Sequence, residues 1–390
     1  MATTSGDART LRGAAFAALE AGDYRAASEQ FAHLVASGAA DAAAWFGLSL
    51  AHRHLGATAE ENNALEQALV LDKKFLPALI RKGDLHAQQG DGSAACSYYG
   101  AAVRLAAQRP ALSPELRSEV QRAEAAARHL TGEFEGYLLR TLAARGLKEP
   151  GSERFARTVE LLLGKRQIYL QHPKYFYFPE LPQIEFYDRR DFPWARALEA
   201  RTADIRAELQ GLLASGTGFV PYLRRAPDRP TFDNPLLDNP AWSAGYLIQD
   251  GREVPENCSR CPKTLAALRE VPLCRIAART PSVLFSLLRP GTRLRPHHGY
   301  TNARLICHLP LIVPPNCGLR VGNETREWRN GELLVFDDSI EHEAWNLSAE
   351  LRVVLLFDVW RPELTATERT LVAATIEAVS AFGGPKTWSD

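Results

Sequence analysis

The sequence predicts an α+β chain of more than one domain, in which a helical solenoid precedes a domain of short antiparallel strands. Two observations predict this order. Gly22, Gly56 and Gly90 recur every 34 residues (56 − 22 and 90 − 56), which is the period of tetratricopeptide repeats. From about residue 280, short apolar runs alternate with turn residues, as in antiparallel β-domains. We expect tetratricopeptide-like repeats over 1–130, linking helices over 131–165 and the β-rich domain over 166–390.

The repeats are predicted from apolar positions as well as from the glycines. Phe31, Leu65 and Tyr99 are bulky and share one phase of the repeat. Glycine suits the left-handed turn after the first helix of each pair, and an amphipathic pair buries its apolar face only by stacking on its neighbours. Such arrays present a concave groove that binds a peptide or partner protein. We therefore expect this part to recruit a partner rather than to carry chemistry.

The helical character continues beyond the repeats and then stops. Ser113-Pro114 is a typical helix start, and "FARTVELLLGKR" predicts a further helix near 155–166. The next stretch, "QHPKYFYFPELPQIEFYDRRDFPW" (171–194), is rich in proline and aromatic residues and has no helical period, so we place the domain boundary near residue 166. The following "FPWARALEARTADIRAELQGLLAS" predicts one amphipathic helix.

The C-terminal part is predicted to contain seven short strands. "SVLFSLLR", "ARLICHLPLIV", "CGLRVG", "TREW", "ELLVF", "HEAWN" and "LRVVLLFDVW" are separated by turn residues. This spacing favours a closed or two-sheet antiparallel fold of the jelly-roll or cupin kind. Asn330-Gly331 is the strongest hairpin signal.

Composition excludes several classes of protein. The 390 residues contain 46 Lys+Arg and 46 Asp+Glu. The chain therefore lacks the excess of basic residues that is typical of a nucleic-acid binder. No apolar run approaches the roughly 20 residues that span a bilayer, and the start lacks the pattern of a secretory signal. We expect a cytoplasmic protein without a membrane partner. Cys258 and Cys261 form a lone C-x-x-C without the second pair that a zinc site requires; we expect structural thiols, with a redox or disulfide role as the alternative.

Histidines predict the candidate site. "RPHHGYTNARLICHLP" contains His297, His298 and His308, and His342 and Arg352 follow on later strand-like runs. A facial triad for non-haem iron needs two histidines and a carboxylate, but residue 299, where the carboxylate is expected, is glycine. An arginine fork binds a carboxylate such as that of 2-oxoglutarate through two parallel hydrogen bonds. The glycine leaves three readings: water or another ligand takes the position, a halide takes it, or the site is inactive.

Three longer stretches carry a family resemblance. "RPHHGYTNARLICHLPLIVP", "GELLVFDDSIEHEAWN" and "LRVVLLFDVWRPEL" resemble the catalytic domain of aspartyl/asparaginyl β-hydroxylases, a family that also carries tetratricopeptide repeats. The resemblance implies a double-stranded β-helix with Fe(II), and with 2-oxoglutarate and O₂ as co-substrates. The family lacks the triad carboxylate, so Gly299 matches its pattern.

The resemblance also implies a role for each site residue. It makes His297 and His342 the metal ligands and places His308 beside the co-substrate. It gives Ser286 and Arg352 the distal carboxylate of 2-oxoglutarate, and Arg304 and Asn302 the substrate. We expect His298 to face away from the site. We expect Asp337 and Asp338 to act as hydrogen-bond partners rather than as the missing ligand.

Two departures from the family pattern concern the substrate. Animal members have an arginine where this chain has Ile306 and a lysine where it has Leu284, so positive charge for a substrate carboxylate is lost here. Three hypotheses remain open. The first is hydroxylation of the β-carbon of an aspartyl or asparaginyl residue, or of a related carboxylate-bearing target, brought by the repeats. The second is hydroxylation of a free amino acid, an acyl chain or a carrier-bound small molecule. The third is a non-catalytic scaffold.

Overall fold

A computed structural model describes residues 5–225, 233–277 and 279–382. The chain divides into two compact units, Met1–Ala156 and Arg157–Asp390. The predicted boundary near residue 166 falls inside the second unit. No helix among the described residues is both long and apolar enough to cross a membrane.

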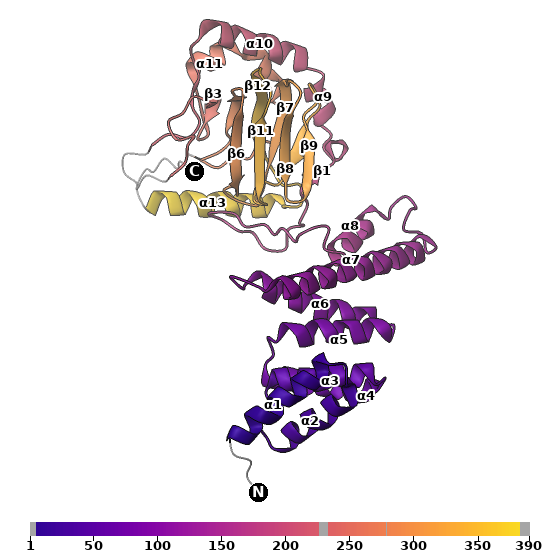
Figure 1. Ribbon diagram of the computed structural model, residues 1–390. Coiled ribbons are helices and arrows are strands. Elements are labelled where there is room, and N and C mark those ends of the chain that lie inside the picture. The colour runs from indigo at the N-terminus through magenta and orange to yellow at the C-terminus, as the bar shows by residue number, and fades with distance from the viewer. Residues whose placement is uncertain (1–4, 226–232, 278, 383–390) are drawn as a thin grey trace. The chain divides into compact units, whose positions relative to one another are not determined.

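The first unit consists of antiparallel helix pairs, as predicted (Figure 1). The helices are α1 (Ser5–Glu20), α2 (Tyr24–Ala36), α3 (Ala42–His54), α4 (Thr58–Leu71), α5 (Leu76–Gln88), α6 (Gly92–Ala107) and α7 (Pro114–Ala143). Gly22, Gly56 and Gly90 lie between the helices of successive pairs with φ of 77°, 74° and 78°, where side chains other than glycine are strained. The predicted division at residue 130 falls inside α7, so the repeats and the linking helices share this helix.

The repeats bury the positions that the sequence phase predicts. Phe31 and Leu65 are 0% exposed and Tyr99 is 2% exposed. Each packs against small residues of a neighbouring helix: Phe31 lies against Gly47 of α3, Tyr99 lies against Gly83 of α5, and Leu65 shares an apolar cluster with Ala78 of α5. Stacked pairs therefore share one apolar core, as a solenoid requires.

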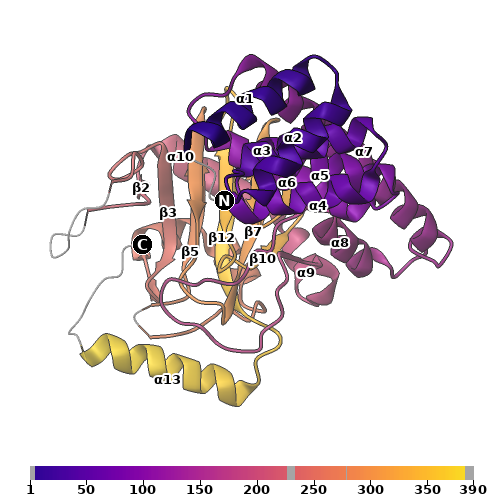
Figure 2. The ribbon, with the colours of Figure 1, turned by 60° about the horizontal axis from the view of Figure 1, so that its bottom comes forward.

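The second unit contains two antiparallel sheets. Its strands are β1 (Phe186–Tyr187), β2 (Val220–Pro221), β3 (Trp242–Gln249), β4 (Arg252–Glu253), β5 (Val283–Leu288), β6 (Thr292–His297), β7 (Arg304–Ile312), β8 (Cys317–Val321), β9 (Glu324–Glu327), β10 (Leu334–Phe336), β11 (His342–Asn346) and β12 (Arg352–Trp360). The larger sheet has the order β1-β10-β7-β12-β5-β3-β2, of which β10 to β2 can be followed in Figure 2, and the smaller one has the order β6-β11-β8-β9.

The helices of this unit are α8 (Glu153–Leu162, which begins before the division between the units), η1 (Arg189–Asp191), α9 (Ala195–Glu199), α10 (Thr202–Ser215), α11 (Pro255–Arg260), α12 (Pro262–Ala267) and α13 (Ala366–Phe382). The single helix predicted from residue 192 is wrong, because the chain forms two helices that are separated at Ala200 and Arg201. The Thr202 hydroxyl donates to the Glu199 carbonyl at 2.6 Å at this break.

Side-chain alternation on the central strands separates two apolar layers. Val353, Leu355 and Phe357 of β12 pack with α9, α10 and the neighbouring strands on the outer face of the larger sheet. Val354 faces the other way and packs with residues of both sheets. The space between the sheets is where the polar residues of β12 and β7 also lie, because their positions share this parity.

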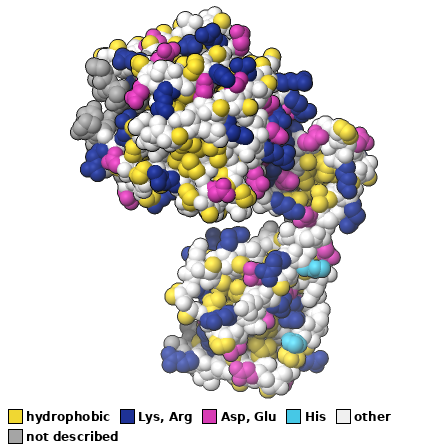
Figure 3. Space-filling view, turned by 90° about the horizontal axis from the view of Figure 1, so that it is seen from above, with side chains coloured by type: hydrophobic (Ala, Val, Ile, Leu, Met, Phe, Trp, Pro, Cys, Tyr) yellow, Lys and Arg dark blue, Asp and Glu magenta, His cyan; other side chains and the backbone are white. Residues whose placement is uncertain are grey.

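The predicted hairpin at Asn330-Gly331 is wrong. These residues form a turn, and Gly331 has φ of 81°. However, β9 before the turn pairs with β8 in the smaller sheet, whereas β10 after it pairs with β7 in the larger one. The turn therefore carries the chain from one sheet to the other. The face drawn in Figure 3 has Lys and Arg side chains interspersed with Asp and Glu, in keeping with the balanced charge.

Candidate active site

A cavity of about 490 Å³ lies in the second unit and is lined from both sheets. The larger sheet contributes polar and apolar side chains of β3, β5, β7 and β12: Trp242, Ser286, Arg304, Ile306, His308, Arg352 and Leu356. The smaller sheet contributes Leu294, His297, Leu319, His342 and Ala344. Six of the predicted site residues therefore share one cavity: Ser286, His297, Arg304, His308, His342 and Arg352.

His297 and His342 are brought together by strand pairing. They are register partners at the ends of β6 and β11, and their ring centroids lie 4.1 Å apart. In each ring Nδ1 faces a backbone carbonyl, that of Arg295 at 2.7 Å for His297 and that of Ile340 at 3.1 Å for His342. A carbonyl only accepts, so Nδ1 carries the proton and the lone pair lies on Nε2. This is the tautomer in which histidine binds a metal.

Burial keeps one of these rings neutral. His342 is 8% exposed, and burial, followed by the neighbouring His297, holds the pKa of His342 well below its ordinary value. A metal ligand must be deprotonated at the coordinating nitrogen. Burial therefore favours the neutral form of His342, which is the form that can bind a metal.

In the described part of the chain, no carboxylate or thiol joins the histidine pair as a third candidate ligand. Among the described residues, no group of three or more His, Cys, Asp and Glu side chains could hold a metal ion. A Cβ at Gly299 would lie 2.0 Å from Oδ2 of Asp338, and the Gly299 N–H donates to the Asp338 carbonyl at 2.6 Å. The Asp338 side chain thus fills the space that a carboxylate at position 299 would need.

Arg352 is buried without an acidic partner in the part of the chain that the structure describes. It is 1% exposed, and its Nη1 donates to the Ser286 carbonyl at 3.2 Å. Its guanidinium carbon lies 4.5 Å from the ring centroid of Trp328, and its Nε has no hydrogen-bond partner. Burial lowers the pKa of Arg352 to about 9. A desolvated cation is costly unless a counter-charge joins it, so the cavity is suited to an anion at this end.

His308 and Ser286 lie on the strands that flank β12. His308 is 6% exposed, and its Nδ1 has no hydrogen-bond partner. Burial, followed by the charge of Arg352, holds the pKa of His308 well below its ordinary value. The Ser286 hydroxyl accepts a hydrogen bond from Nε1 of Trp242 at 3.4 Å. Both side chains therefore offer neutral hydrogen-bonding groups to a ligand.

Arg304 lines the cavity, but carboxylates already hold its guanidinium. Nη1 donates to Asp358 at 2.8 Å and Nη2 to Asp338 at 3.1 Å. Asp358 is fully buried, which raises its pKa, while Arg304 opposes this shift. The positive charge of Arg304 is thus balanced within the protein. Ile306, the next residue on this face of β7, leaves an apolar wall.

Asn302 is not brought to the cavity. It is 0% exposed, and its Nδ2 donates to Oε1 of Gln171 at 2.9 Å and to the Phe178 carbonyl at 2.8 Å. Its Oδ1 accepts from the Phe178 N–H at 2.7 Å. The substrate-binding role predicted for Asn302 is therefore corrected: its amide is used within the protein.

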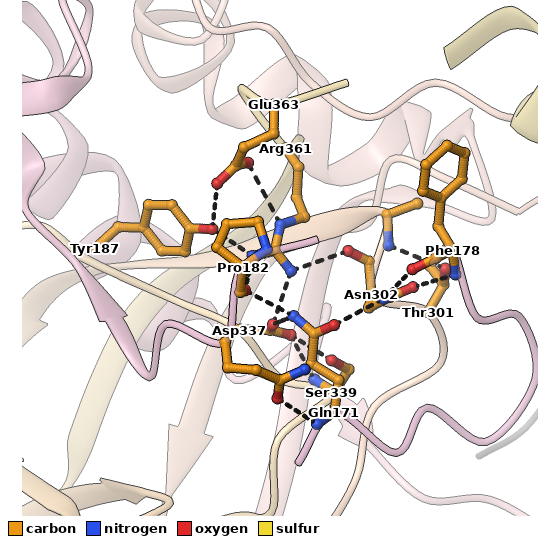
Figure 4. A network of polar contacts seen from close by, with 12 residues as sticks. Gln171, Phe178, Pro182, Tyr187, Thr301, Asn302, Asp337, Ser339, Arg361 and Glu363 are labelled. Carbon is orange, nitrogen blue, oxygen red and sulfur yellow. Dashed lines mark hydrogen bonds and ion pairs between the residues drawn. The ribbon is translucent and has the colours of Figure 1, made fainter. Parts of the chain in front are cut away.

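Sequence reasoning missed the residues that surround Asn302. Gln171, Tyr187 and Arg361 join it and Asp337 in a buried polar network (Figure 4). Their sequence signal is weak, because they lie far apart along the chain.

Cys258 and Cys261, the lone C-x-x-C of the sequence, are free thiols, and burial raises the pKa of each.

Comparison with known proteins places a family likeness over the site. Residues 199–362 match the family described as aspartyl/asparaginyl beta-hydroxylase. The chain is 40% identical over 143 residues to the mouse aspartyl/asparaginyl beta-hydroxylase, covering 36% of this chain and 19% of that protein. It is 36% identical over 194 residues to the ornithine lipid ester-linked acyl 2-hydroxylase of Rhizobium tropici, covering 47% and 63%. The resemblance predicted from the sequence motifs is confirmed for this part of the chain.

A further relative and two solved structures extend the comparison. The human aspartate beta-hydroxylase domain-containing protein 2 is 34% identical over 205 residues, covering 51% of this chain and 53% of that protein. The chain thus spans less than two thirds of these relatives. PcrH from Pseudomonas aeruginosa is 22% identical with a TM-score of 0.30, covering 33% of this chain and 95% of PcrH. The first TPR of Spaghetti (RPAP3), bound to an HSP90 peptide, is 16% identical with a TM-score of 0.28, covering 32% and 97%.

Proposed function

Because residues 199–362 are similar to the aspartyl/asparaginyl beta-hydroxylase family, we propose that this protein is an Fe(II)- and 2-oxoglutarate-dependent dioxygenase that hydroxylates an unactivated C–H bond. One observation carries the proposal. The histidine pair, with its Nε2 lone pairs, lines the same cavity as Arg352, which is buried and has no carboxylate partner among the described residues. A metal and an anionic co-substrate would thus each meet the group that suits it.

The donor set fits a ferrous ion. Two neutral imidazoles suit iron, and two protein ligands leave several positions for a co-substrate and oxygen. Iron, 2-oxoglutarate and O₂ together would supply the oxidising power needed to put a hydroxyl group on carbon. The protein's part is to hold the imidazole rings by their Nδ1 hydrogen bonds and to keep position 299 without a side chain.

The co-substrate would bind between β5, β7 and β12. Arg352 would give its planar fork to the distal carboxylate, which would also relieve the cost of the buried charge. Ser286 would donate its hydroxyl hydrogen to the same carboxylate. His308 would hydrogen-bond the co-substrate nearer to the metal. Leu294, Leu319, Phe336 and Leu356 surround this part of the cavity and would exclude water from it.

The sequence predicts two candidate classes of substrate. A carboxylate-bearing target, such as an aspartyl or asparaginyl residue, needs a cation at the substrate end of the cavity. Arg304 is already held by Asp338 and Asp358, and Ile306 provides no charge. These contacts favour the second class, that of a free amino acid, an acyl chain or a carrier-bound small molecule, and within it the acyl chain, which needs no cation. The relatives include hydroxylases named for both kinds of target.

Two further features belong to this proposal. The two facing antiparallel sheets with the site between them are the arrangement expected of a double-stranded β-helix. The helical repeats would bind a peptide or protein segment and thereby bring a target to the enzyme. A scaffold without catalysis remains the competing function, and it predicts no stoichiometric iron binding.

Anaerobic titration with Fe(II) and 2-oxoglutarate tests the proposal. We expect the wild type to develop a weak metal-to-ligand charge-transfer band at about 500 nm, as a chelated ferrous site does. His342→Ala should lose the band, because one of the two ligands is removed. Arg293→Ala, an exposed change on the neighbouring β6 outside the cavity lining, is the control and should retain it.

The outcomes separate the candidate functions. A band in the wild type and in Arg293→Ala alone supports the dioxygenase, and release of succinate can then be used to search for the substrate among acyl and carboxylate-bearing compounds. If neither the wild type nor any variant binds iron, the enzyme proposal is wrong and the repeats become the functional part.

A further inference from the structure

The segment Gln171–Phe178, called the strap here, runs along both loops that adjoin the histidine pair. One loop follows His297 and the other precedes His342. The His172 N–H donates to the Ser339 carbonyl at 2.7 Å, on the second loop. The N–H groups of Lys174 and Tyr175 donate to the carbonyls of Gly299 and Tyr300 at 2.9 and 3.1 Å, on the first loop. The strap is thus bonded to each loop through its backbone.

Gln171 joins the two loops through one side chain. Its Nε2 donates to Oδ2 of Asp337 at 2.7 Å and to the Pro182 carbonyl at 3.0 Å, and its Oε1 accepts from Nδ2 of Asn302 at 2.9 Å. Asp337 belongs to the loop before His342 and Asn302 to the loop after His297. Figure 4 shows the Gln171 amide between these two side chains. Gln171 is 6% exposed, so water does not compete strongly for these bonds.

Each partner of Gln171 is anchored on its own side. Asp337 pairs with Nη1 of Arg361 at 2.8 Å and accepts from the Ser339 hydroxyl and N–H. Asn302 bonds both backbone groups of Phe178, and its carbonyl accepts from Nη1 of Arg361 at 3.2 Å. Both ends of the bridge are therefore fixed, and two side chains span the loops in parallel: the amide of Gln171 and Nη1 of Arg361.

The loops determine how the imidazole rings are held. The carbonyl that orients His342 belongs to Ile340, in the loop that carries Asp337. The hydrogen bond from Gly299 to Asp338 connects the loops directly beside the cavity. Groups that bind a metal must be held within about 0.5 Å of the productive geometry. A change in the spacing of the loops would thus act on the two Nε2 atoms together.

We propose that Gln171 is a positioning residue for the metal site, which helps to set the separation of the two histidine-bearing loops by bridging the side chains of Asp337 and Asn302 beside the Arg361 bridge. This inference rests on the proposed function, because it assigns Gln171 a task in holding the two ligands that bind the metal. It differs from a purely stabilising role in one respect. It requires that loss of the bridge weakens metal binding in protein that is still folded.

Gln171→Met is the variant that removes the bridge with the least change of volume. Asp337 keeps its ion pair with Arg361, and the backbone bonds of the strap remain. Tyr177→Ala is the matched control, because Tyr177 lies on the same strap with 52% exposure and takes part in none of the network's hydrogen bonds described above. Co(II) alone serves as the probe, since its absorption spectrum reports coordination in the absence of co-substrate.

We expect Gln171→Met to bind Co(II) about 10- to 100-fold more weakly than the wild type, the usual effect of losing a residue that orients metal ligands. Tyr177→Ala should bind as the wild type does. Hydrogen exchange of the metal-free protein gives a second readout. In Gln171→Met, the amides of His172, Lys174 and Gly299 should exchange faster, while those of the helical repeats stay unchanged.

A second variant covers the case in which Gln171→Met does not fold. Asn302→Asp keeps the shape but removes the donor to Gln171 and to the Phe178 carbonyl, and it should weaken Co(II) binding at least as much. The double variant should then be no weaker than the weaker single one, because both changes break one bridge. Wild-type affinity in folded Gln171→Met or Asn302→Asp overturns the inference and leaves the proposed function intact. Absence of Co(II) and Fe(II) binding in the wild type overturns both.

Discussion

Two arginines at opposite ends of strand β12 are equally buried but differently partnered. Arg352 begins the strand and is 1% exposed, while Arg361 directly follows it and is 0% exposed. Arg361 pairs with Asp337 at 2.8 Å and also donates to the Pro182 carbonyl and to the Tyr187 hydroxyl. Arg352 has a backbone carbonyl and an aromatic ring, and no carboxylate among the described residues.

The difference shows in the direction of each pKa shift. Burial lowers the pKa of Arg352 to about 9. The pKa of Arg361 is raised, because Asp337, Tyr187 and Glu363 together outweigh the opposing effect of burial. A buried arginine with an internal counter-charge stabilises the fold around it. A buried arginine without one costs stability until an anion arrives, which is how a binding site differs from a structural ion pair.

The largest expected effect is on the free energy of unfolding when Arg361, at the C-terminal end of β12, is replaced. Arg361→Met would leave Asp337 buried beside Gln171 without its cation, and loss of one partner of a buried ion pair costs about 3–5 kcal/mol of unfolding free energy. We expect this loss in urea unfolding that is followed by signals of the second unit. Restoring neutrality with Arg361→Met/Asp337→Asn should recover part of it. An unchanged unfolding free energy for Arg361→Met would show that the ion pair contributes little.

At Arg352, at the N-terminal end of β12, the change in stability is expected to have the opposite sign. Arg352→Met removes a desolvated charge that has no counter-charge, so the ligand-free protein should be as stable as the wild type or more stable. Binding of 2-oxoglutarate should weaken by about 2–5 kcal/mol, the usual cost of truncating one partner of a buried charge pair. Calorimetry in the presence of Mn(II) measures the binding, and Co(II) affinity should be retained. A ligand-free variant that is markedly less stable would contradict the comparison.

Much of the site could be predicted from local patterns. His297 and His342 meet because strand ends pair in register, and Ser286, His308 and Arg352 share a cavity because alternate strand residues face the same side. The histidines and Arg352 stand out in short motifs, whereas Ser286 is implied only by the family resemblance. The two-sheet arrangement was predicted from the strand-like runs for the same reason, since hydrophobic alternation is a local property of the chain.

The remaining features depend on contacts between distant segments. Gln171 bonds Asn302 across 131 residues and Asp337 across 166 residues, and no local pattern marks such partners. Asn302 lies inside the most informative motif, yet the strap takes up its amide. The turn at Asn330-Gly331 has hairpin chemistry, but strand pairing sends its two sides to different sheets. In each case tertiary packing decides what the local sequence leaves open.

The smallest expected effect concerns the serine beside Arg352. The carbonyl of Ser286 holds Nη1 of Arg352, and its hydroxyl accepts a long bond from Trp242. Ser286→Ala keeps the carbonyl and removes only the hydroxyl, so the arginine stays in place and the stability should change little. The affinity for 2-oxoglutarate should fall by about 0.5–1.5 kcal/mol, the net value of one hydrogen bond. Calorimetry of Ser286→Ala and Arg352→Met under the same conditions compares their affinities for 2-oxoglutarate. Equal losses in the two variants would mean that Arg352 alone does not provide the anion site, whereas a small loss in Ser286→Ala and a large one in Arg352→Met assigns the charge to the arginine.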